Sequence, residues 1–188
     1  DPILITLLKY KEFTLNDVHM TSIALIAFSI GLPGMIGSKI LITNYYSRKD
    51  TKYPVKAALI AVLCNFVLNI AFVIYLVKTD FNGAHIGLAV ATSLSAYVNF
   101  FFLFKNAVKT KIFNMDKDIV FYILKSVVAT IVMSAFLLYF DLSKQVWMNY
   151  ELLERVMNLF LLIIFSALIY FAFLYLFNIK PKNIKEQL

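Results

Sequence analysis

The sequence has little cysteine, glycine, proline and charge, and each shortage excludes a class of protein. Cys64 is the one cysteine in 188 residues, which excludes an intramolecular disulfide and a multi-cysteine metal site. Five glycines and four prolines are too few for collagen or for a sandwich of many short strands. Only 15% of the residues are charged and 61% are hydrophobic, against roughly 25% and 45–50% in soluble domains. The composition therefore predicts a polytopic membrane protein.

Five stretches of the chain are long and apolar enough to cross a bilayer. A hydrocarbon core of about 30 Å requires ~20 helical residues at ~1.5 Å each. These stretches are too long and too continuously apolar for the alternating strands of a membrane barrel. We therefore predict an all-α polytopic membrane protein with five transmembrane helices. The predicted helices are Met20–Ser38, extending to about Tyr45 if Lys39 reaches the interface, then Ala57–Val77, Ala84–Phe104, Ile119–Phe140 and Val156–Phe177.

The net charge of +7 is distributed unevenly between the two sides of these helices. Basic residues gather in the short cytoplasmic loops of membrane proteins. We therefore predict that the amino end lies outside and the carboxyl end lies in the cytoplasm, and nucleic acid is not a predicted partner. The basic residues predicted inside are Arg48, Lys49, Lys52, Lys56, Lys105, Lys109, Lys111, Lys117, Lys180, Lys182 and Lys185; those outside are Lys9, Lys11, Lys78 and Lys144.

The predicted helices divide the chain into five parts. Residues 1–19 form an outer amphipathic leader, in which Ile3, Leu4, Leu7 and Leu8 share one face of a short surface helix. The chain begins at Asp1 and has an odd number of spans, so we expect a piece of a longer protein. The other parts are three transmembrane helices in residues 20–106, a cytoplasmic loop in 107–118, two further transmembrane helices in 119–177 and a cytoplasmic tail in 178–188.

Two of the predicted helices carry matching stripes of small and polar residues. Small residues allow helices to approach closely in a bilayer, and their amides can then hydrogen-bond across the interface, so the two stripes are predicted to meet. Asn65, Asn69 and Thr92 could alternatively bind a small cation or line a substrate path, although no carboxylate lies in any of the five spans. The stripes are Ala57, Ala61, Asn65 and Asn69, and Gly87, Ala91, Ser95 and Asn99.

The first predicted helix has an irregular centre, where Gly31, Pro33, Gly34 and Gly37 lie close together. Proline cannot donate a backbone hydrogen bond, and its ring opens the preceding turn, so the sequence predicts a kink. These four residues are candidates for a hinge, although many passive helices also contain proline. Lys39, which follows them, either reaches the cytoplasmic interface or faces a central cavity and attracts a phosphate.

The chain lacks the usual signatures of catalysis. There is no Gly-rich phosphate loop, no His-Glu-x-x-His motif, no Ser-His-Asp order and no pair of intramembrane acids. His19 and His85 are isolated and are predicted near the outer ends of helices. The sequence therefore does not predict an enzyme.

Three segments resemble the MurJ (MviN) lipid II flippases. Lys39–Lys56 is similar to a cytoplasmic turn of that family, with a lysine, an aromatic-Tyr-Ser-Arg step, an Asp-Thr and a Pro-Val-Lys in the same order. The stretch from Leu7 to Asp17 resembles the outer amphipathic segment before the family's tenth helix, and Gly87–Ser93 resembles its twelfth. The resemblance implies that the five predicted helices of this chain correspond to helices ten to fourteen of a MATE-like fold with two lobes.

The resemblance implies a transporter of the bacterial inner membrane that moves the undecaprenyl-linked peptidoglycan precursor by alternating access. Its partners would be the lipid bilayer, that precursor and the amino-terminal lobe of the same protein. Lys39, Asn65 and Asn69 become candidates for the substrate cavity, and the last two helices become a groove for the lipid tail. Some members bind sodium at positions matching Asn65, Asn69 and Thr92; because Asn69 replaces a carboxylate, a weak sodium site is implied at most, and no other cofactor.

Two other functions fit the same residues. One is another exporter of the superfamily, for polysaccharide-lipid units or drugs, which the turn from Lys39 to Lys56 disfavours. The other is a small membrane subunit without transport chemistry of its own. The number of hydrophobic spans encoded upstream would separate the second from a flippase.

Overall fold

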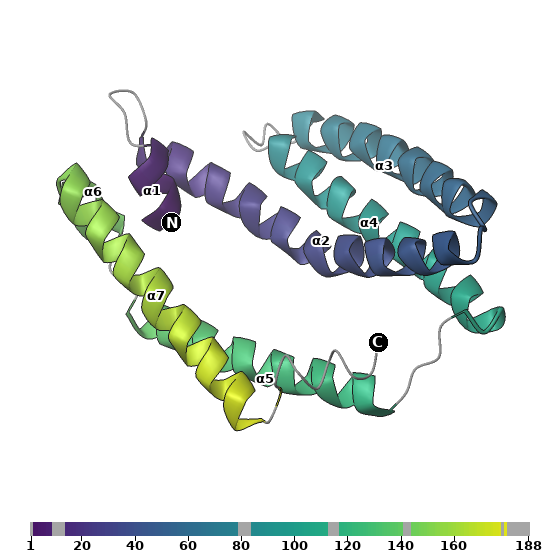
Figure 1. Ribbon diagram of the computed structural model, residues 1–188. Coiled ribbons are helices and arrows are strands. Elements are labelled where there is room, and N and C mark those ends of the chain that lie inside the picture. The colour runs from purple at the N-terminus through teal and green to yellow at the C-terminus, as the bar shows by residue number, and fades with distance from the viewer. Residues whose placement is uncertain are drawn as a thin grey trace. The chain divides into compact units, whose positions relative to one another are not determined.

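The computed structural model describes residues 2–8, 14–78, 84–112, 117–140, 144–177 and 179, and all regular structure within them is helical. The predicted basic residues Lys9, Lys11, Lys180, Lys182 and Lys185 lie outside these ranges. The helices are α1 (Pro2–Leu8), α2 (Leu15–Ser47), α3 (Lys52–Lys78), α4 (Ala84–Lys109), α5 (Lys117–Tyr139), α6 (Lys144–Asn149) and α7 (Leu152–Leu176) (Figure 1).

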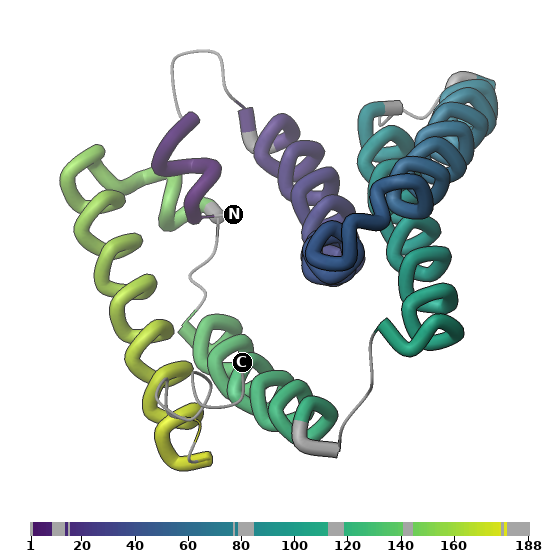
Figure 2. Tube along the Cα trace, turned by 45° about the vertical axis from the view of Figure 1, so that its right-hand side comes forward, coloured from purple at the N-terminus to yellow at the C-terminus, as the bar shows by residue number. Residues whose placement is uncertain are grey.

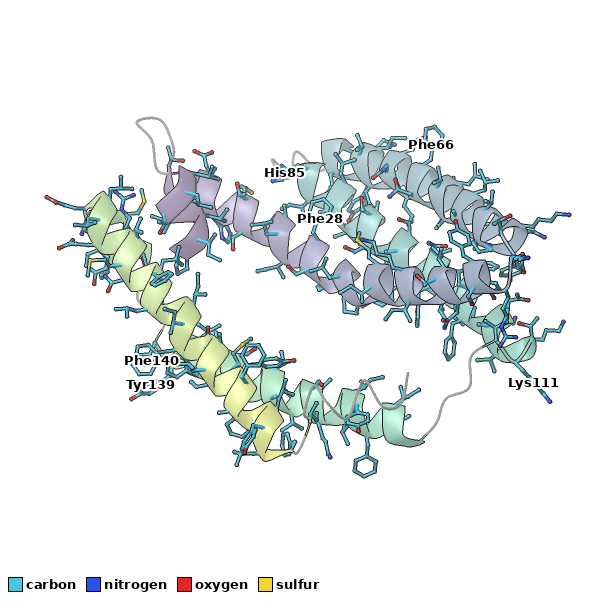
Figure 3. All side chains as sticks on the ribbon, in the orientation of Figure 1. Phe28, Phe66, His85, Lys111, Tyr139 and Phe140 are labelled. Carbon is cyan, nitrogen blue, oxygen red and sulfur yellow. The ribbon has the colours of Figure 1, made fainter. Side chains whose placement is uncertain are left out.

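The five predicted transmembrane helices are confirmed as α2, α3, α4, α5 and α7, each of which is long and apolar enough to cross a membrane. The largest difference from the prediction is at α2, which begins at Leu15 rather than Met20 and continues to Ser47. Asn16 and Asp17 lie in its first turn, where polar side chains can remain in the headgroup region. Large apolar side chains project outward, as Phe66 does from α3 (Figure 3), which suits contact with lipid.

The chain folds into two compact units. The bundle unit comprises residues 16–114 and contains α2, α3 and α4. The hairpin unit comprises residues 1–15 and 115–188 and contains α1, α5, α6 and α7. The structure therefore groups the leader helix with the last helices of the chain.

The bundle unit is held together at one end by Tyr45 of α2. Its ring is fully buried and stacks on Tyr53 with 5.7 Å between ring centroids. Its hydroxyl donates to the carbonyl of Leu103 at 3.0 Å and accepts from the side-chain amide of Asn106 at 2.9 Å. Leu41 and Ala57 are buried in the same cluster. Tyr45 thus fixes the end of α2 against α4.

Two helices of the bundle unit end with a lysine in the left-handed backbone conformation, with φ of 59° at Lys49 and 54° at Lys111. Both ends have the two reverse hydrogen bonds of a Schellman motif, which satisfy carbonyls that the helix leaves free. The guanidinium of Arg48 reaches the carbonyl of Lys111 at 3.5 Å, so the two ends lie side by side. The reverse bonds run from Asp50 to Tyr45 (3.1 Å), Lys49 to Tyr46 (2.9 Å), Ile112 to Ala107 (2.8 Å) and Lys111 to Val108 (3.2 Å).

The next helix begins directly after the first of these ends. The carboxylate of Asp50 accepts hydrogen bonds from the backbone amides of Lys52 and Tyr53, at 3.1 and 3.3 Å. These are two of the amides that the first turn of a helix leaves without partners. The Asp-Thr step of the predicted cytoplasmic turn therefore starts α3.

In the hairpin unit, α5 packs against α7, and α1 packs against α6 and α7 (Figure 2). The buried residues of α1 are Leu4, Ile5 and Thr6. Of the predicted apolar face, Leu4 is buried and Ile3, Leu7 and Leu8 are exposed, so the position of this helix at the membrane surface stays a prediction. Ile5, which is not part of the predicted face, is fully buried.

Two basic side chains stabilise helix ends in the hairpin unit. Arg155 is 8% exposed, and its guanidinium donates to the carbonyls of Tyr150 at 2.9 Å and Ile5 at 3.4 Å. The ammonium of Lys125 donates to the carbonyl of Phe177 at 3.1 Å, just after the end of α7. Cations at the carboxyl ends of helices satisfy free carbonyls and complement the helix dipole. Lys125, the one charged residue in the predicted span Ile119–Phe140, is therefore paired with a backbone carbonyl.

Candidate functional site

The two polar stripes of α3 and α4 meet, as the sequence predicts. The side-chain amide of Asn65 donates to the hydroxyls of Thr92 at 3.4 Å and Ser95 at 3.2 Å. The amide of Asn69 donates to the side-chain oxygen of Asn65 at 2.9 Å. At Gly87, a Cβ atom would lie 2.9 Å from the Cβ of Phe72, so this glycine allows the close approach of the two helices.

A cavity of about 350 Å³ opens beside this cluster, within the bundle unit. Asn65, Thr92 and Ser95 form part of its wall, and Asn99 lies on the same wall with its side-chain oxygen buried and without a hydrogen-bond partner. The polar groups of this cavity are uncharged, so it suits neutral hydrogen-bonding groups. The remaining lining residues are Met35, Ala58, Ala61, Val62 and Ala96.

The residues predicted for a weak sodium site, Asn65, Asn69 and Thr92, are brought together by the contact between α3 and α4. Asn65 and Asn69 direct amide N–H groups at three of the nearby oxygens, whereas the side-chain oxygen of Asn69 is buried without a hydrogen-bond partner. The hydroxyl of Thr92 also donates to the carbonyl of Leu88 at 2.8 Å. Within the described residues no group of three or more His, Cys, Asp or Glu side chains could hold a metal. A cation usually needs several free, preferably anionic, oxygens. Sodium binding at these residues stays a prediction.

The glycines of α2 face α4. A Cβ atom at Gly31 would lie 2.8 Å from the backbone Cα of Ser93, and one at Gly34 would lie 3.2 Å from the backbone of Ala96. A Cβ at Gly37 would meet the ring of Phe100 at 2.6 Å. Close packing of α2 on α4 therefore accounts for the three glycines. Their role as a hinge stays a prediction.

Pro33 lies on the opposite, exposed side of α2, near the middle of that helix. Figure 1 shows that α2 changes direction about halfway along its length, which agrees with the predicted kink. Before Pro33, two backbone carbonyls of α2 accept hydrogen bonds from α4. The hydroxyl of Ser93 donates to Ala27 at 2.5 Å, and that of Tyr97 donates to Ile30 at 2.7 Å.

The sequence analysis missed Ser93 and Tyr97 as partners of the kink. The signal that could have found them is their spacing. Ser93, Tyr97 and Phe100 recur on one face of α4, just as Gly31, Gly34 and Gly37 recur on one face of α2. The pairing itself depends on how the two helices cross, which no local pattern specifies.

Lys39 lies on the exposed surface of α2 and does not line the cavity beside Asn65. Its backbone carbonyl accepts from the hydroxyl of Thr43 at 3.0 Å, a bond within one helix. The structure therefore separates Lys39 from the Asn65, Asn69 and Thr92 cluster. The two predicted roles of its ammonium group both stay predictions.

A second cavity, of about 270 Å³, lies within the hairpin unit between α1, α5 and α7. Its walls are almost entirely apolar, and Ser166 contributes the one hydroxyl among the lining residues that the structure describes. A cavity of this composition suits a hydrocarbon chain. The other lining residues are Pro2, Ile3, Leu137, Leu159, Leu162 and Ile163.

The helices and cavities define a polytopic α-helical membrane protein in which a bent, glycine-rich helix packs on a polar helix pair. Comparison with known families is more specific: residues 1–160 match the family described as "Lipid II flippase MurJ". The chain belongs to this family.

Curated relatives agree with this assignment. A probable lipid II flippase MurJ of Vibrio cholerae is 33% identical over 98% of this chain and 34% of its own length. A probable lipid II flippase MurJ of Haemophilus influenzae is 31% identical over 97% of this chain and 34% of its own. A lipid II flippase MurJ of Burkholderia cenocepacia is 26% identical over 95% of this chain. The chain spans about a third of the length of these relatives.

Replacing Asn65 with Leu should destabilise the α3–α4 pair. The change removes the amide that donates to the hydroxyls of Thr92 and Ser95 and the oxygen that accepts from the amide of Asn69. We expect the free energy of unfolding to fall by about 1–2 kcal/mol. Thermal unfolding of the detergent-solubilised protein would measure the loss. Phe66→Leu, at the neighbouring exposed position, is the control and should leave the melting temperature unchanged. Equal melting temperatures for Asn65→Leu and the wild type would contradict a stabilising role of the cluster.

Replacing Gly31 with Ala should lower stability more than replacing Gly37 with Ala. The new Cβ at residue 31 meets backbone, so the helices must separate, whereas at residue 37 it meets the ring of Phe100, which can rotate. We expect the free energy of unfolding to fall by about 1–3 kcal/mol in Gly31→Ala and by less in Gly37→Ala. Melting temperatures of the two variants would show the order, and the reverse order would mean that α2 and α4 are not packed as described.

Proposed function

We propose that this chain forms part of a flippase that carries the undecaprenyl-linked peptidoglycan precursor across the bacterial inner membrane by alternating access. The observation that carries the proposal is the match of residues 1–160 to the lipid II flippase family, on five helices able to span a membrane. The chemistry of such a substrate explains why a protein is needed. A diphosphate-sugar headgroup cannot cross ~30 Å of hydrocarbon without a hydrated path, whereas its prenyl tail can remain in lipid.

We place the basic end of the bundle unit in the cytoplasm. Arg48, Lys49 and Lys52 lie at the turn between α2 and α3, and Lys109 and Lys111 lie at the end of α4, all exposed. The contact between Arg48 and Lys111 brings the two segments to one end of the unit. His85 lies at the opposite end of α4 from Lys111 (Figure 3). The positive-inside rule supports a cytoplasmic carboxyl terminus on this basis.

The hairpin unit suits the lipid part of the substrate. Phe160, Phe165 and Phe171 of α7 are exposed around the helix, and the apolar cavity between α1, α5 and α7 could take one segment of a prenyl chain. Burial of each methylene of such a chain contributes about 0.8 kcal/mol. Recognition of the headgroup is assigned to the rest of the polypeptide, together with Lys39.

Complementation tests the proposed function directly. The full-length protein, expressed in a bacterium depleted of its own lipid II flippase, should restore growth and cell shape. A variant with a charge in the hairpin cavity, Leu162→Glu, should fail to do so at equal abundance, because burial of an unpaired carboxylate among apolar residues is unfavourable. Growth arrest with the wild-type protein at normal abundance would refute the proposal.

Lys39 can be tested by measuring the rate of flipping of the purified precursor in vesicles that contain the full-length protein. If its ammonium attracts the diphosphate, Lys39→Gln should slow flipping severalfold while Lys39→Arg retains most of the rate, because only arginine keeps the charge. Lys105→Gln, at an exposed position on α4, is the matched control for loss of a surface charge. Equal rates for Lys39→Gln and Lys39→Arg would assign Lys39 to the membrane interface alone.

A further inference from the structure

Arg155 joins three helices at one corner of the hairpin unit. It lies in the first turn of α7, and its guanidinium donates to the carbonyl of Tyr150, directly after α6, and to that of Ile5 on α1. Both carbonyls are at helix ends, where the helix itself supplies no donor. Arg155 and Ile5 are both buried, so water does not compete for the bond between them. Helices as short as α1 and α6 are unstable alone, and one cation ties both of them to α7.

Helix α1 also forms one wall of the apolar cavity in the hairpin unit. Pro2 and Ile3 line this cavity from α1, Leu137 lines it from α5, and the other lining residues belong to α7. Without α1 the cavity would be a groove between α5 and α7 that is open along one side. The position of α1 therefore decides how much of the cavity is enclosed, and Arg155 helps to fix that position.

The cavity offers contact with hydrocarbon and no free hydroxyl. Ser166 supplies the one hydroxyl among the described lining residues, and it already donates to the carbonyl of Ile163 at 3.0 Å. The lining residues of α7 lie between Leu159 and Ser166, roughly 10–20 Å along the helix from its start, which is the depth of the hydrocarbon core. A charged headgroup finds no partner there, whereas an apolar chain does.

The volume of the cavity suits a short length of chain. An apolar cavity of roughly 150 Å³ holds benzene, which has six carbon atoms. By the same ratio, the cavity of about 270 Å³ holds roughly ten carbon atoms, or two isoprene units. The cavity therefore suits the end of a prenyl chain rather than its whole length.

We infer that Arg155 is a positioning residue for the binding of a prenyl chain: it holds α1 where Ile3 bounds the cavity, and the side chain at residue 3 limits the chain that fits. The inference rests on the proposed function, which supplies the prenyl chain as the occupant. The hydrogen bonds of Arg155 with α1 and with the end of α6 do not depend on that function.

The test locates the end of a bound prenyl chain. The full-length protein in nanodiscs is irradiated with a farnesyl phosphate that carries a diazirine at the far end of its chain, and mass spectrometry measures the labelled fraction of each segment. Labelling should concentrate in Leu159–Ser166. A phosphatidylglycerol with a diazirine at the end of one acyl chain should label this segment severalfold less. Equal labelling by both probes would mean that any membrane chain fits, and would reject the prenyl assignment.

Replacing Ile3 with Trp should lower the prenyl labelling of this segment about fivefold or more, because the larger side chain fills part of the cavity. Leu7→Trp, at an exposed position of the same helix that does not line the cavity, is the matched control and should leave labelling unchanged. Full labelling in Ile3→Trp, or an equal loss in Leu7→Trp, would overturn the role of residue 3.

Replacing Arg155 with Gln should lower the same labelling about three- to tenfold and speed amide hydrogen exchange in α1, because the bond to Ile5 is lost. Arg155→Lys keeps the charge and should recover part of the labelling. Lys125→Gln is the matched control: it removes another cation bonded to a carbonyl in the hairpin unit, that of Phe177, and should change neither quantity. Normal labelling in Arg155→Gln, or a loss of labelling without faster exchange in α1, would overturn the positioning role.

The inference and the proposed function can fail separately. A vesicle assay with the purified precursor measures flipping by the wild-type protein, whereas labelling needs no transport. Labelling of Leu159–Ser166 without flipping would support the binding of the chain and reject the proposed function. Flipping with labelling confined to other segments would retain the function and overturn the inference.

Discussion

The structure depends on the absence of water from the hydrocarbon core, where every backbone polar group must find a partner within the protein. Along most of each helix the partner is the next turn. Where the regular pattern is interrupted, a side chain from another element takes over, as Lys125 does after the end of α7 and Arg155 does at Ile5. The places where side chains bind backbone are therefore the places where the helices are joined.

Helix α4 is joined on two sides, to a side chain of α3 and to the backbone of α2. Toward α3 it presents Thr92 and Ser95, which bind the amide of Asn65. Toward α2 it presents Ser93 and Tyr97, which bind backbone carbonyls. Adjacent residues on one helix thus serve different neighbours. The bundle unit is organised around α4, and a change in the position of α2 relative to α4 need not disturb the α3–α4 pair.

Much of the fold could be predicted from the sequence because lipid imposes simple rules on length and polarity. The five spans, the contact between the stripes of Asn65 and Ser95, and the kink at Pro33 all follow from such rules. The buried face of α1 and the partners of Arg155 could not be predicted, because they depend on segments far apart in sequence. The candidate site was predicted in part, because Asn65, Asn69 and Thr92 do lie together. The hydrogen bonds from Ser93 and Tyr97 to α2 could not be predicted, because they depend on how α2 crosses α4.

The lysines that end α2 and α4 adopt a conformation that costs a residue with a side chain roughly 1–2 kcal/mol and that glycine adopts freely. Glycine at Lys49 or Lys111 would therefore make a more stable helix end, but it would also remove a positive charge, and positive charges in short loops favour the cytoplasmic side of a membrane. At both positions the chain has a basic residue in a backbone conformation that glycine would adopt more easily. At each of these two positions, a gain in thermodynamic stability would therefore come with the loss of one positive charge.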